Sequence, residues 1–306
     1  MTEALERFTA ASLARPVRDE VRGFAERLAQ EAGAAAALFY GSNLRTGSLD
    51  GVLDFYLLLP GAQRERVWPR IGYREYAAAD DTVLRAKTAT LSLAQFASAA
   101  AGDSRDTTIW TRFAQPCALL WTRDEAARSM VVGAIAEAAQ TAAGLAAALG
   151  PAEGSWEDYW RALFRATYRA EFRVERPGRE AAILHHAPDH FRALLPLAWL
   201  AAGLPYEETA LGVYRPLLRG DDRRRWLRWW EARRRLGKPL NIARLIKAAG
   251  TFDGAADYAA WKVARHSGIA LAVTPFRRAH PVLSVPGAAW ELWRKRRARP
   301  SDRPQL

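Results

Sequence analysis

Hydrophobic residues near the N-terminus recur first at helical and then at strand spacing. Four of them lie three or four positions apart, at Val17, Val21, Phe24 and Leu28. This spacing predicts an amphipathic helix over residues 16–32, which Pro16 opens and Gly33 closes. Short apolar runs over residues 35–40 and 52–59, each followed by glycine or proline, predict two buried strands.

The hydrophobic pattern changes character near residue 150. In the first half we predict a helix over residues 63–72, strands over 88–96 and 116–121, and an Ala-rich helix over 123–149. After the turn-forming segment PAEGS, nearly every periodic segment is helical: residues 156–174, 179–186, 189–202, 206–214, 221–236 and 241–249. We therefore predict an α+β protein with a mixed domain over 1–150, a mainly helical domain over 151–275 and a basic C-terminal segment over 276–306.

Composition and charge narrow the possible functions. The single cysteine, Cys117, excludes a disulfide framework and a cysteine-ligated zinc site, and the spacing of the five histidines fits no zinc site. No segment has the length and apolar character that we expect of a membrane span, and the N-terminal sequence lacks the pattern of a secretory signal, so we expect a cytoplasmic protein. The net charge of +12 indicates an anionic partner: nucleic acid, a lipid surface or a phosphorylated ligand.

The segment FYGSNLRTGSLDGVLDFYLLL carries the strongest indication of chemistry. The first predicted strand ends at Gly41 and Ser42, and the second carries Asp54 among bulky apolar residues. This is the arrangement of a nucleotidyltransferase: the glycine lets the backbone approach a triphosphate, the serine and nearby N–H groups bind its oxygens, and the carboxylate holds Mg²⁺. An unpaired acid in an apolar strand is otherwise costly, although Asp54 could instead cap a loop or pair with an arginine.

One departure from this arrangement concerns the second acidic residue. Nucleotidyltransferases usually have two acids two residues apart on one strand face, but Val52 occupies the first of these positions. The nearest alternative is Asp50, which on a straight strand would lie about 13 Å from Asp54. Both could bind one ion only if Gly51 bends the chain. We therefore take Asp54 as the main catalytic and metal-binding candidate and Asp50 as the second.

Four segments resemble, in the same order, those of the mitochondrial-type phosphatidate cytidylyltransferases, also called the translocator assembly and maintenance protein family. They are YGS at 40–42, LDFYLLL at 53–59, IWTRFAQP at 109–116 and LFRATYRAEFRVERPGR at 163–179. The resemblance runs from about residue 39 to residue 268 and implies a nucleotidyltransferase domain followed by a helical, winged-helix-like domain. It also implies that CTP and phosphatidic acid react, with Mg²⁺, to give CDP-diacylglycerol and pyrophosphate.

The resemblance also implies roles for individual residues of the first half. Gly41 and Ser42 would hold the triphosphate, and Asp54 would hold the metal. Arg112 matches the family's arginine, whereas Gln115 stands where the family has a lysine. Loss of that lysine removes a cation that could contact phosphate.

Further phosphate-binding candidates lie on both sides of residue 150. Glu171 stands where the family has an aspartate, and Arg173 follows it two positions later. The family has a lysine in a place similar to that of Lys87, which could reach the triphosphate or be an exposed lysine of an edge strand. Lys247, Lys262 and Arg265 could contact substrate phosphate or lie on a solvated face.

Tryptophans and basic residues occur together in two segments of the second half. Residues 223–238 carry Trp226, Trp229 and Trp230 on one helical face beside many arginines, and residues 290–299 have a similar composition. Such helices suit the interface of an anionic membrane. The first segment is equally compatible with a tryptophan core face and a solvated arginine face, or with stacking on single-stranded nucleic acid. The resemblance implies a C-terminal amphipathic anchor, so we expect peripheral attachment to the inner membrane face and no nucleic-acid partner.

The departures from the family's pattern leave two other functions open. A nucleotidyltransferase acting on a different acceptor is one, because Val52 and Gln115 differ from the expected acid and lysine. A non-catalytic relative that binds a membrane or another partner through its basic helices is the other.

Overall fold

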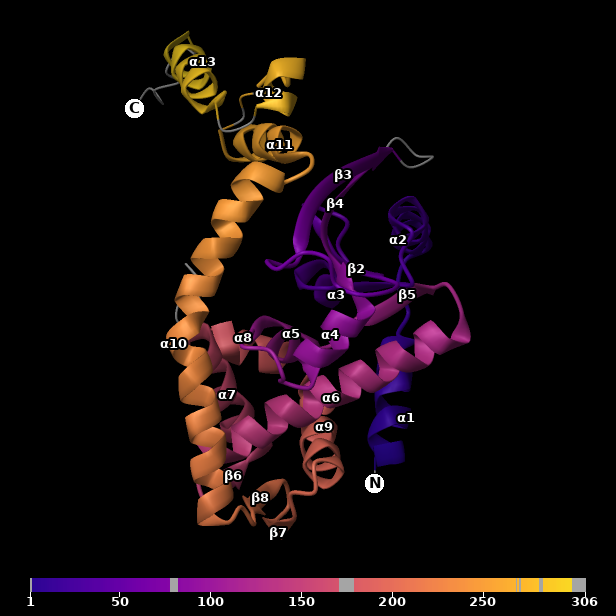
Figure 1. The fold of residues 1–306 in the computed structure, drawn as a ribbon, viewed down its shortest axis with the longest axis vertical. Helices are drawn as coiled ribbons and strands as arrows, with labels where there is room; N and C mark the ends of the chain where they lie inside the picture. The colour runs from indigo at the N-terminus through magenta and orange to yellow at the C-terminus, as the bar shows by residue number, and fades with distance from the viewer. Residues whose placement is uncertain are drawn as a thin grey trace, which may run out of the picture.

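A five-stranded mixed sheet lies at the centre of the first half in the computed structural model, which describes residues 2–77, 82–170, 179–267, 269, 271–280 and 283–298. Its order is β3-β4-β2-β1-β5; the β2–β4 pair is parallel and the other three pairs are antiparallel (Figure 1). The strands are β1 (Ala36–Tyr40), β2 (Leu53–Leu59), β3 (Arg70–Ala77), β4 (Val83–Ser92) and β5 (Ala118–Thr122). The predicted α+β class is confirmed.

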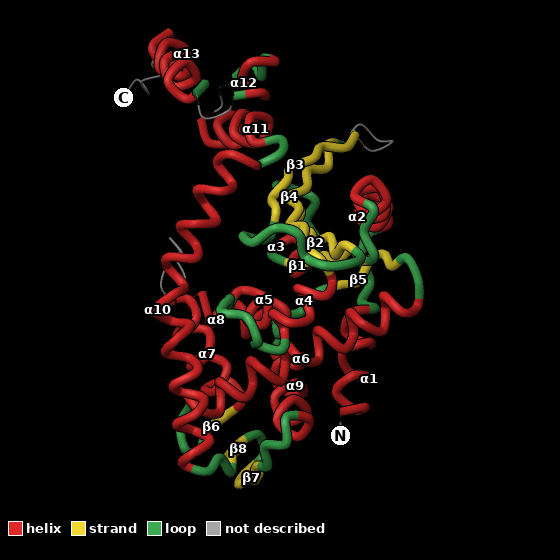
Figure 2. The backbone as a smooth tube through the Cα atoms, in the orientation of Figure 1, coloured by secondary structure: helices red, strands yellow, loops and turns green. Residues whose placement is uncertain are grey.

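Helices cover both faces of this sheet (Figure 2). On one face lies α2 (Asp19–Ala32), whose Phe24 contacts Phe55 with ring centroids 6.0 Å apart. The other face is covered by α4 (Leu93–Ala100), α5 (Thr108–Phe113) and α6 (Glu125–Leu149). Because side chains alternate along a strand, β2 directs Phe55 toward α2 and Tyr56 into the helical core.

The helices of the second half pack against the same core. The main hydrophobic cluster joins Phe96 and Trp110 of the first half to Trp160, Trp199 and Trp230 of the second. The helices that pack here are α1 (Thr2–Leu13), α7 (Trp156–Ala170), α8 (Arg179–His186), α9 (Pro188–Ala201) and α10 (Gly220–Thr251). A small sheet is made of β6 (Gly154–Ser155), β8 (Val213–Pro216) and β7 (Tyr206–Ala210), in that order. One continuous core therefore crosses the PAEGS segment.

The long helix α10 connects the small sheet to the C-terminal helices, which lie beside the outer edge of the large sheet (Figure 1). These helices are α11 (Ala255–Ser267), α12 (Pro275–Ala279) and α13 (Val285–Ala298). The backbone N–H of Tyr73 in β3 donates to the carbonyl of Asp253, at 2.7 Å, and the Tyr73 ring lies 5.3 Å from that of Tyr258 in α11. The start of α11 is thus fixed to β3 by backbone and aromatic contacts.

The helix α6 is long and apolar enough to cross a membrane by length and composition alone. However, 72% of its most apolar 18-residue window is buried inside the protein. Its alanines and Gly144 allow close approach of its neighbours: a Cβ atom at Gly144 would meet the Trp226 ring of α10 at 2.4 Å. The apolar character of α6 is therefore accounted for by packing.

Two predicted helices are wrong: the first segment is mostly irregular and the second is a strand hairpin. Residues 63–69 form no regular element, and β3 begins at Arg70; Pro69 lacks the N–H that a helix needs and disfavours helical geometry at the preceding residue. Residues 206–214 form most of the β7–β8 hairpin, in which Gly212 adopts a φ of 73°. That positive φ ends a strand rather than continuing a helix.

Other predicted elements are present with different bounds. The strand predicted over residues 88–96 is β4, which begins at Val83 and ends at Ser92, where the serine side chain caps α4 by accepting from the Gln95 N–H. The helices predicted over residues 221–236 and 241–249 are one helix, α10, which continues through Pro239. Contacts made by Trp230 before the proline and by Arg244 after it offset the hydrogen bond that Pro239 removes.

Candidate active site

Four residues form a row across the large sheet, at the end of β1, near the start of β2 and midway along β4 and β3. Strand register pairs Tyr40 of β1 with Asp54 of β2, Asp54 with Lys87 of β4, and Lys87 with Tyr73 of β3. Directly paired residues project from the same face, which here is the face that carries Tyr56 into the helical core. Asp54 and Lys87 therefore lie side by side where that core ends.

Gly41 lies beside the Asp54 carboxylate, with no room for a side chain between them. It adopts a φ of 94° and a ψ of −162°, between β1 and the short helix α3 (Ser42–Thr46). A Cβ atom at this position would lie 3.0 Å from Oδ2 of Asp54, and a side chain in this backbone conformation is strained. The structure thus brings the predicted glycine and the predicted carboxylate into contact, with the exposed Ser42 immediately beyond them.

The Asp54 carboxylate is half-buried and has three cations nearby. Burial raises the pKa of Asp54, and the charges of Lys87, Arg112 and Arg45 lower it, with burial the larger effect. In the described part of the chain no group forms a hydrogen bond or an ion pair with this carboxylate, so neither loop capping nor arginine pairing accounts for it. A buried carboxylate without a partner is costly unless something binds it.

Arg112 of α5 lies over the aromatic residues next to Asp54. Its guanidinium donates to the Tyr56 hydroxyl at 2.6 Å and lies 5.1 Å from the centre of the Tyr40 ring. Burial raises the pKa of Tyr56, and so the hydroxyl accepts this bond as a neutral phenol. The predicted Arg112 is therefore at the site, and its position is set by two tyrosines of the sheet.

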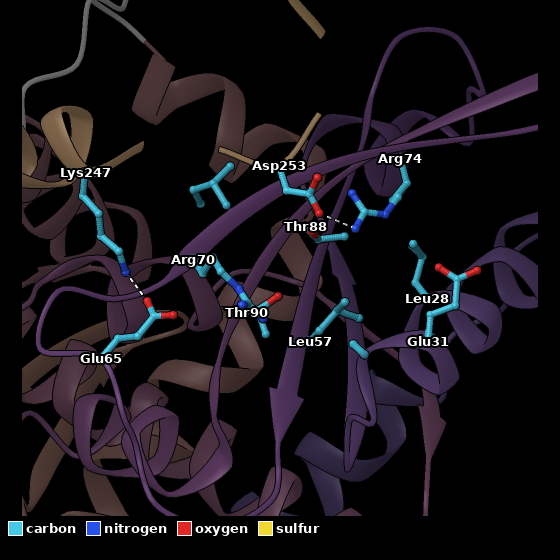
Figure 3. A pocket seen from close by; sticks show the side chains of 13 residues that line it. Leu28, Glu31, Leu57, Glu65, Arg70, Arg74, Thr88, Thr90, Lys247 and Asp253 are labelled. Carbon is cyan, nitrogen blue, oxygen red and sulfur yellow. Dashed lines mark hydrogen bonds and ion pairs between the residues drawn. The ribbon is translucent and has the colours of Figure 1, made fainter. Parts of the chain in front are cut away.

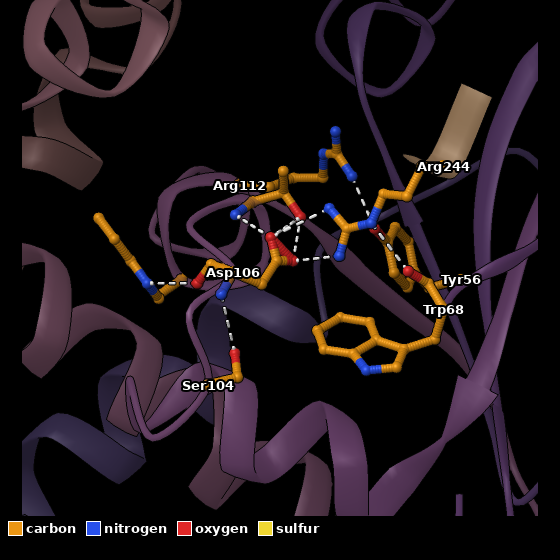
Figure 4. Close-up of polar contacts among 8 residues, drawn as sticks. Tyr56, Trp68, Ser104, Asp106, Arg112 and Arg244 are labelled. Atoms are coloured by element: carbon orange, nitrogen blue, oxygen red, sulfur yellow. Dashed lines mark hydrogen bonds and ion pairs between the residues drawn. The ribbon is translucent and has the colours of Figure 1, made fainter. Parts of the chain in front are cut away.

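A buried ion pair holds α5 in place beneath Arg112 (Figure 4). The Asp106 carboxylate accepts from the Thr108 N–H at 2.8 Å and from the Arg244 guanidinium at 2.8 Å. Burial raises the pKa of Asp106, but Arg244 and Thr108 outweigh it and hold the pKa below its usual range. Arg244 also lies over the Trp68 ring, at 5.0 Å. The long helix α10 is thereby connected to the loop that begins α5.

The loop between α3 and β2 is shaped by Asn43 and Gly51. The buried Asn43 side chain donates to the carbonyls of Ser48 and Asp50, at 2.9 and 2.8 Å. Gly51 has a φ of 93°, so the chain turns there, and the Asp50 side chain is exposed. Among the described residues no group of three or more His, Cys, Asp or Glu side chains could hold a metal ion. A site for Mg²⁺ here would depend on one or two carboxylates, together with water and phosphate oxygens, which is the usual way proteins bind this ion.

The other phosphate-binding candidates lie elsewhere or outside the described residues. Lys247 forms an ion pair with Glu65 and donates to the Val67 carbonyl. It lines a cavity of about 550 Å³ that also contacts α2 and the Thr88 side of β4, the sheet face opposite Asp54 (Figure 3). Lys262 is exposed on α11. Glu171 and Arg173 lie outside the described residues.

The tryptophan face of α10 belongs to the core. Trp229 and Trp230 contact the buried Trp110 of α5, with ring centroids 5.8 and 6.4 Å away. Arg233 lies over Trp229 at 3.7 Å and donates to the Gly102 carbonyl at 2.5 Å, at the end of α4. Of the readings open for residues 223–238, the structure favours a tryptophan core face with a solvated arginine face.

Several site residues were not predicted to belong to the Asp54 site. Asn43 and Arg45 both belong to the run GSNLR at residues 41–45, and this run was the available signal. Arg265 was a candidate for phosphate contact, and the fold adds its place beside Gly51, where a Cβ atom would lie 3.1 Å from its guanidinium. No protein-family model matches the chain, and no curated protein sequence matches it significantly.

Proposed function

We propose that this protein is a Mg²⁺-dependent nucleotidyltransferase with its active site at Asp54. The observation that carries the proposal is the close approach of the Gly41 backbone to the Asp54 carboxylate, which has no hydrogen-bond or ion-pair partner among the described residues and lies next to Lys87 and Arg112. A glycine turn can receive a triphosphate, and a carboxylate without a protein partner can receive a cation. We further propose that residues 1–150 form a nucleotidyltransferase-like domain and that residues 151–275 form a winged-helix-like domain, which the β7–β8 hairpin supports.

Each residue of the site has a role that its chemistry suits. The backbone at Gly41 and the Ser42 hydroxyl would bind triphosphate oxygens. Lys87 and Arg112 would neutralise charge that develops as a phosphoryl group transfers. Asp54, with Asp50 as a second candidate, would hold Mg²⁺, which supplies neutralisation of phosphate charge when bound. Catalysis would consist mainly of positioning and charge neutralisation.

The substrates that we propose are CTP and phosphatidic acid, which give CDP-diacylglycerol and pyrophosphate. The order of the four resembling segments supports this choice. An acceptor phosphate monoester is already largely ionised at neutral pH, so the site needs no strong general base. This suits a site in which cations outnumber carboxylates.

We propose that the protein attaches peripherally to the inner, anionic face of a membrane through α13. Trp290 and Trp293 of this helix are 58% and 50% exposed, and the Arg294 guanidinium lies 4.9 Å from the centre of the Trp290 ring. Exposed indoles beside cations suit the headgroup region of a bilayer. The tryptophans of α10 are not available for this role, because they lie in the core.

Release of pyrophosphate from CTP in the presence of Mg²⁺ and vesicles containing phosphatidic acid tests the proposal. Release that requires both Mg²⁺ and phosphatidic acid supports it. Release with a different acceptor would retain the enzyme class and reject the lipid substrate. Failure to bind any nucleotide, with vesicle binding retained, would identify a non-catalytic relative.

A further inference from the structure

The helix α11 crosses the large sheet on the face that carries Asp54. Three of its side chains lie at helical spacing on one stripe and contact three successive parts of the sheet. Tyr258 packs on Tyr73 of β3, with ring centroids 5.3 Å apart, and the Trp261 ring lies 5.6 Å from the guanidinium of Arg85 in β4. Tyr73 and Arg85 project from the same sheet face as Lys87.

The third side chain of this stripe, Arg265, reaches the loop that leads into β2. A Cβ atom at Gly51 would lie 3.1 Å from its Nη1 atom, and the positive φ of Gly51 lets the chain turn at this point. Position 51 is three residues before Asp54, so α11 brings Arg265 beside the loop that leads to this residue. The contacts of Tyr258 and Trp261 fix the direction in which Arg265 points.

Arg265 has no acidic partner among the described residues, unlike Arg85 and Arg278. Arg85 pairs with Glu75, and Arg278 pairs with Asp257. Arg265 lies 5.4 Å from the centre of the Trp261 ring, and in the described part of the chain it forms no ion pair. It is exposed, and its planar guanidinium can bind two oxygens of one phosphate at once.

We propose that Arg265 binds a phosphate group of a substrate at the Asp54 site, which makes α11 part of the active site. This inference rests on the proposed function. The phosphate belongs either to the nucleotide triphosphate or to the acceptor, and both present the same chemistry to a guanidinium. With Lys87, Arg112 and Arg45, Arg265 completes a group of cations that suits a polyanionic substrate.

The test measures phosphate binding separately from turnover. Wild-type protein, Arg265→Ala, Arg265→Lys and Arg278→Ala are titrated with inorganic tripolyphosphate by calorimetry, and KM for a short-chain soluble phosphatidic acid is measured with CTP and Mg²⁺. Arg278→Ala is the matched control because it removes an exposed arginine from the adjacent α12. Arg265→Ala should weaken binding of the ligand whose phosphate Arg265 contacts by about tenfold or more. Arg265→Lys should recover part of this loss, and the control should change little.

The two sources of phosphate give different results. Weaker tripolyphosphate binding assigns Arg265 to the nucleotide, and a higher KM for phosphatidic acid with unchanged tripolyphosphate binding assigns it to the acceptor. Unchanged values for both ligands in Arg265→Ala would overturn the inference and leave the proposed function standing. If the wild-type protein transfers no nucleotide but binds tripolyphosphate, and Arg265→Ala loses this binding, the proposed function would be rejected while the phosphate site at Arg265 would stand.

Discussion

Replacement of Gly41 by alanine should damage the protein more than the same replacement at Gly47. Both glycines have positive φ, 94° and 69°, but a Cβ atom at Gly47 would have nothing within 4 Å, whereas one at Gly41 would lie 3.0 Å from Asp54 Oδ2. Alanine in the left-handed region costs about 1 kcal/mol, which is the effect expected for Gly47→Ala. The φ and ψ of Gly41 lie in a region open almost only to glycine, so that strain and the contact together should cost about 2–4 kcal/mol.

Urea unfolding of four proteins separates the contact from the backbone strain. Wild type, Gly41→Ala, Asp54→Ala and the double variant form a cycle, and relief of the contact in the double variant should appear as a coupling of about 1 kcal/mol. Gly47→Ala is measured beside them. Equal destabilisation by the two glycine replacements, or additivity in the cycle, would refute the contact between Gly41 and the carboxylate.

Three further perturbations test other parts of the structure. Arg244→Ala leaves the Asp106 carboxylate buried without its cation and should lower the free energy of unfolding by about 3 kcal/mol or more. The control Arg278→Ala breaks an exposed ion pair and should lower it by less than about 1 kcal/mol. Equal urea midpoints for the two variants would contradict the structure. Burial lowers the pKa of His190 to about 4, so this side chain is neutral in the folded protein. The free energy of unfolding should therefore fall by about 2 kcal/mol as the pH is lowered from 7 to 5, because only the unfolded chain takes up a proton there. His190→Gln should remove this pH dependence of stability. The double replacement of Trp290 and Trp293 by alanine should reduce co-sedimentation with anionic vesicles while leaving the thermal midpoint unchanged, and undiminished binding would contradict the role of α13.

The spacing of apolar residues predicted the elements that bury one continuous apolar face in the core. The helix ended by Gly33, the strands β1 and β2 and the helix before residue 150 are all present, because their apolar residues meet a core on the face that the spacing indicates. Periodicity failed where strand pairing, rather than the spacing of apolar residues, decides the structure. Residues 206–210 became a strand through pairing with β8, which no local spacing shows.

The candidate site was predictable only in part, because some of its residues are distant in the sequence. Gly41, Ser42 and Asp54 are close in sequence, so a local pattern could identify them, and register then adds Lys87. Arg265 comes from a helix more than 200 residues later, and only the contacts of α11 with the sheet bring it near. The positions of Glu171 and Arg173 relative to Asp54 stay predictions, since both lie outside the described residues.

The most direct test of the central claim is the effect of Asp54→Asn on turnover of CTP with Mg²⁺ and phosphatidic acid. Burial raises the pKa of Asp54, so a neutral side chain of the same shape removes a desolvation cost, and the variant should be as stable as wild type or more stable. The proposed role predicts that this well-folded variant loses pyrophosphate release almost completely, because it has lost the carboxylate that holds the metal ion. Pyrophosphate release close to the wild-type rate in Asp54→Asn would contradict that role.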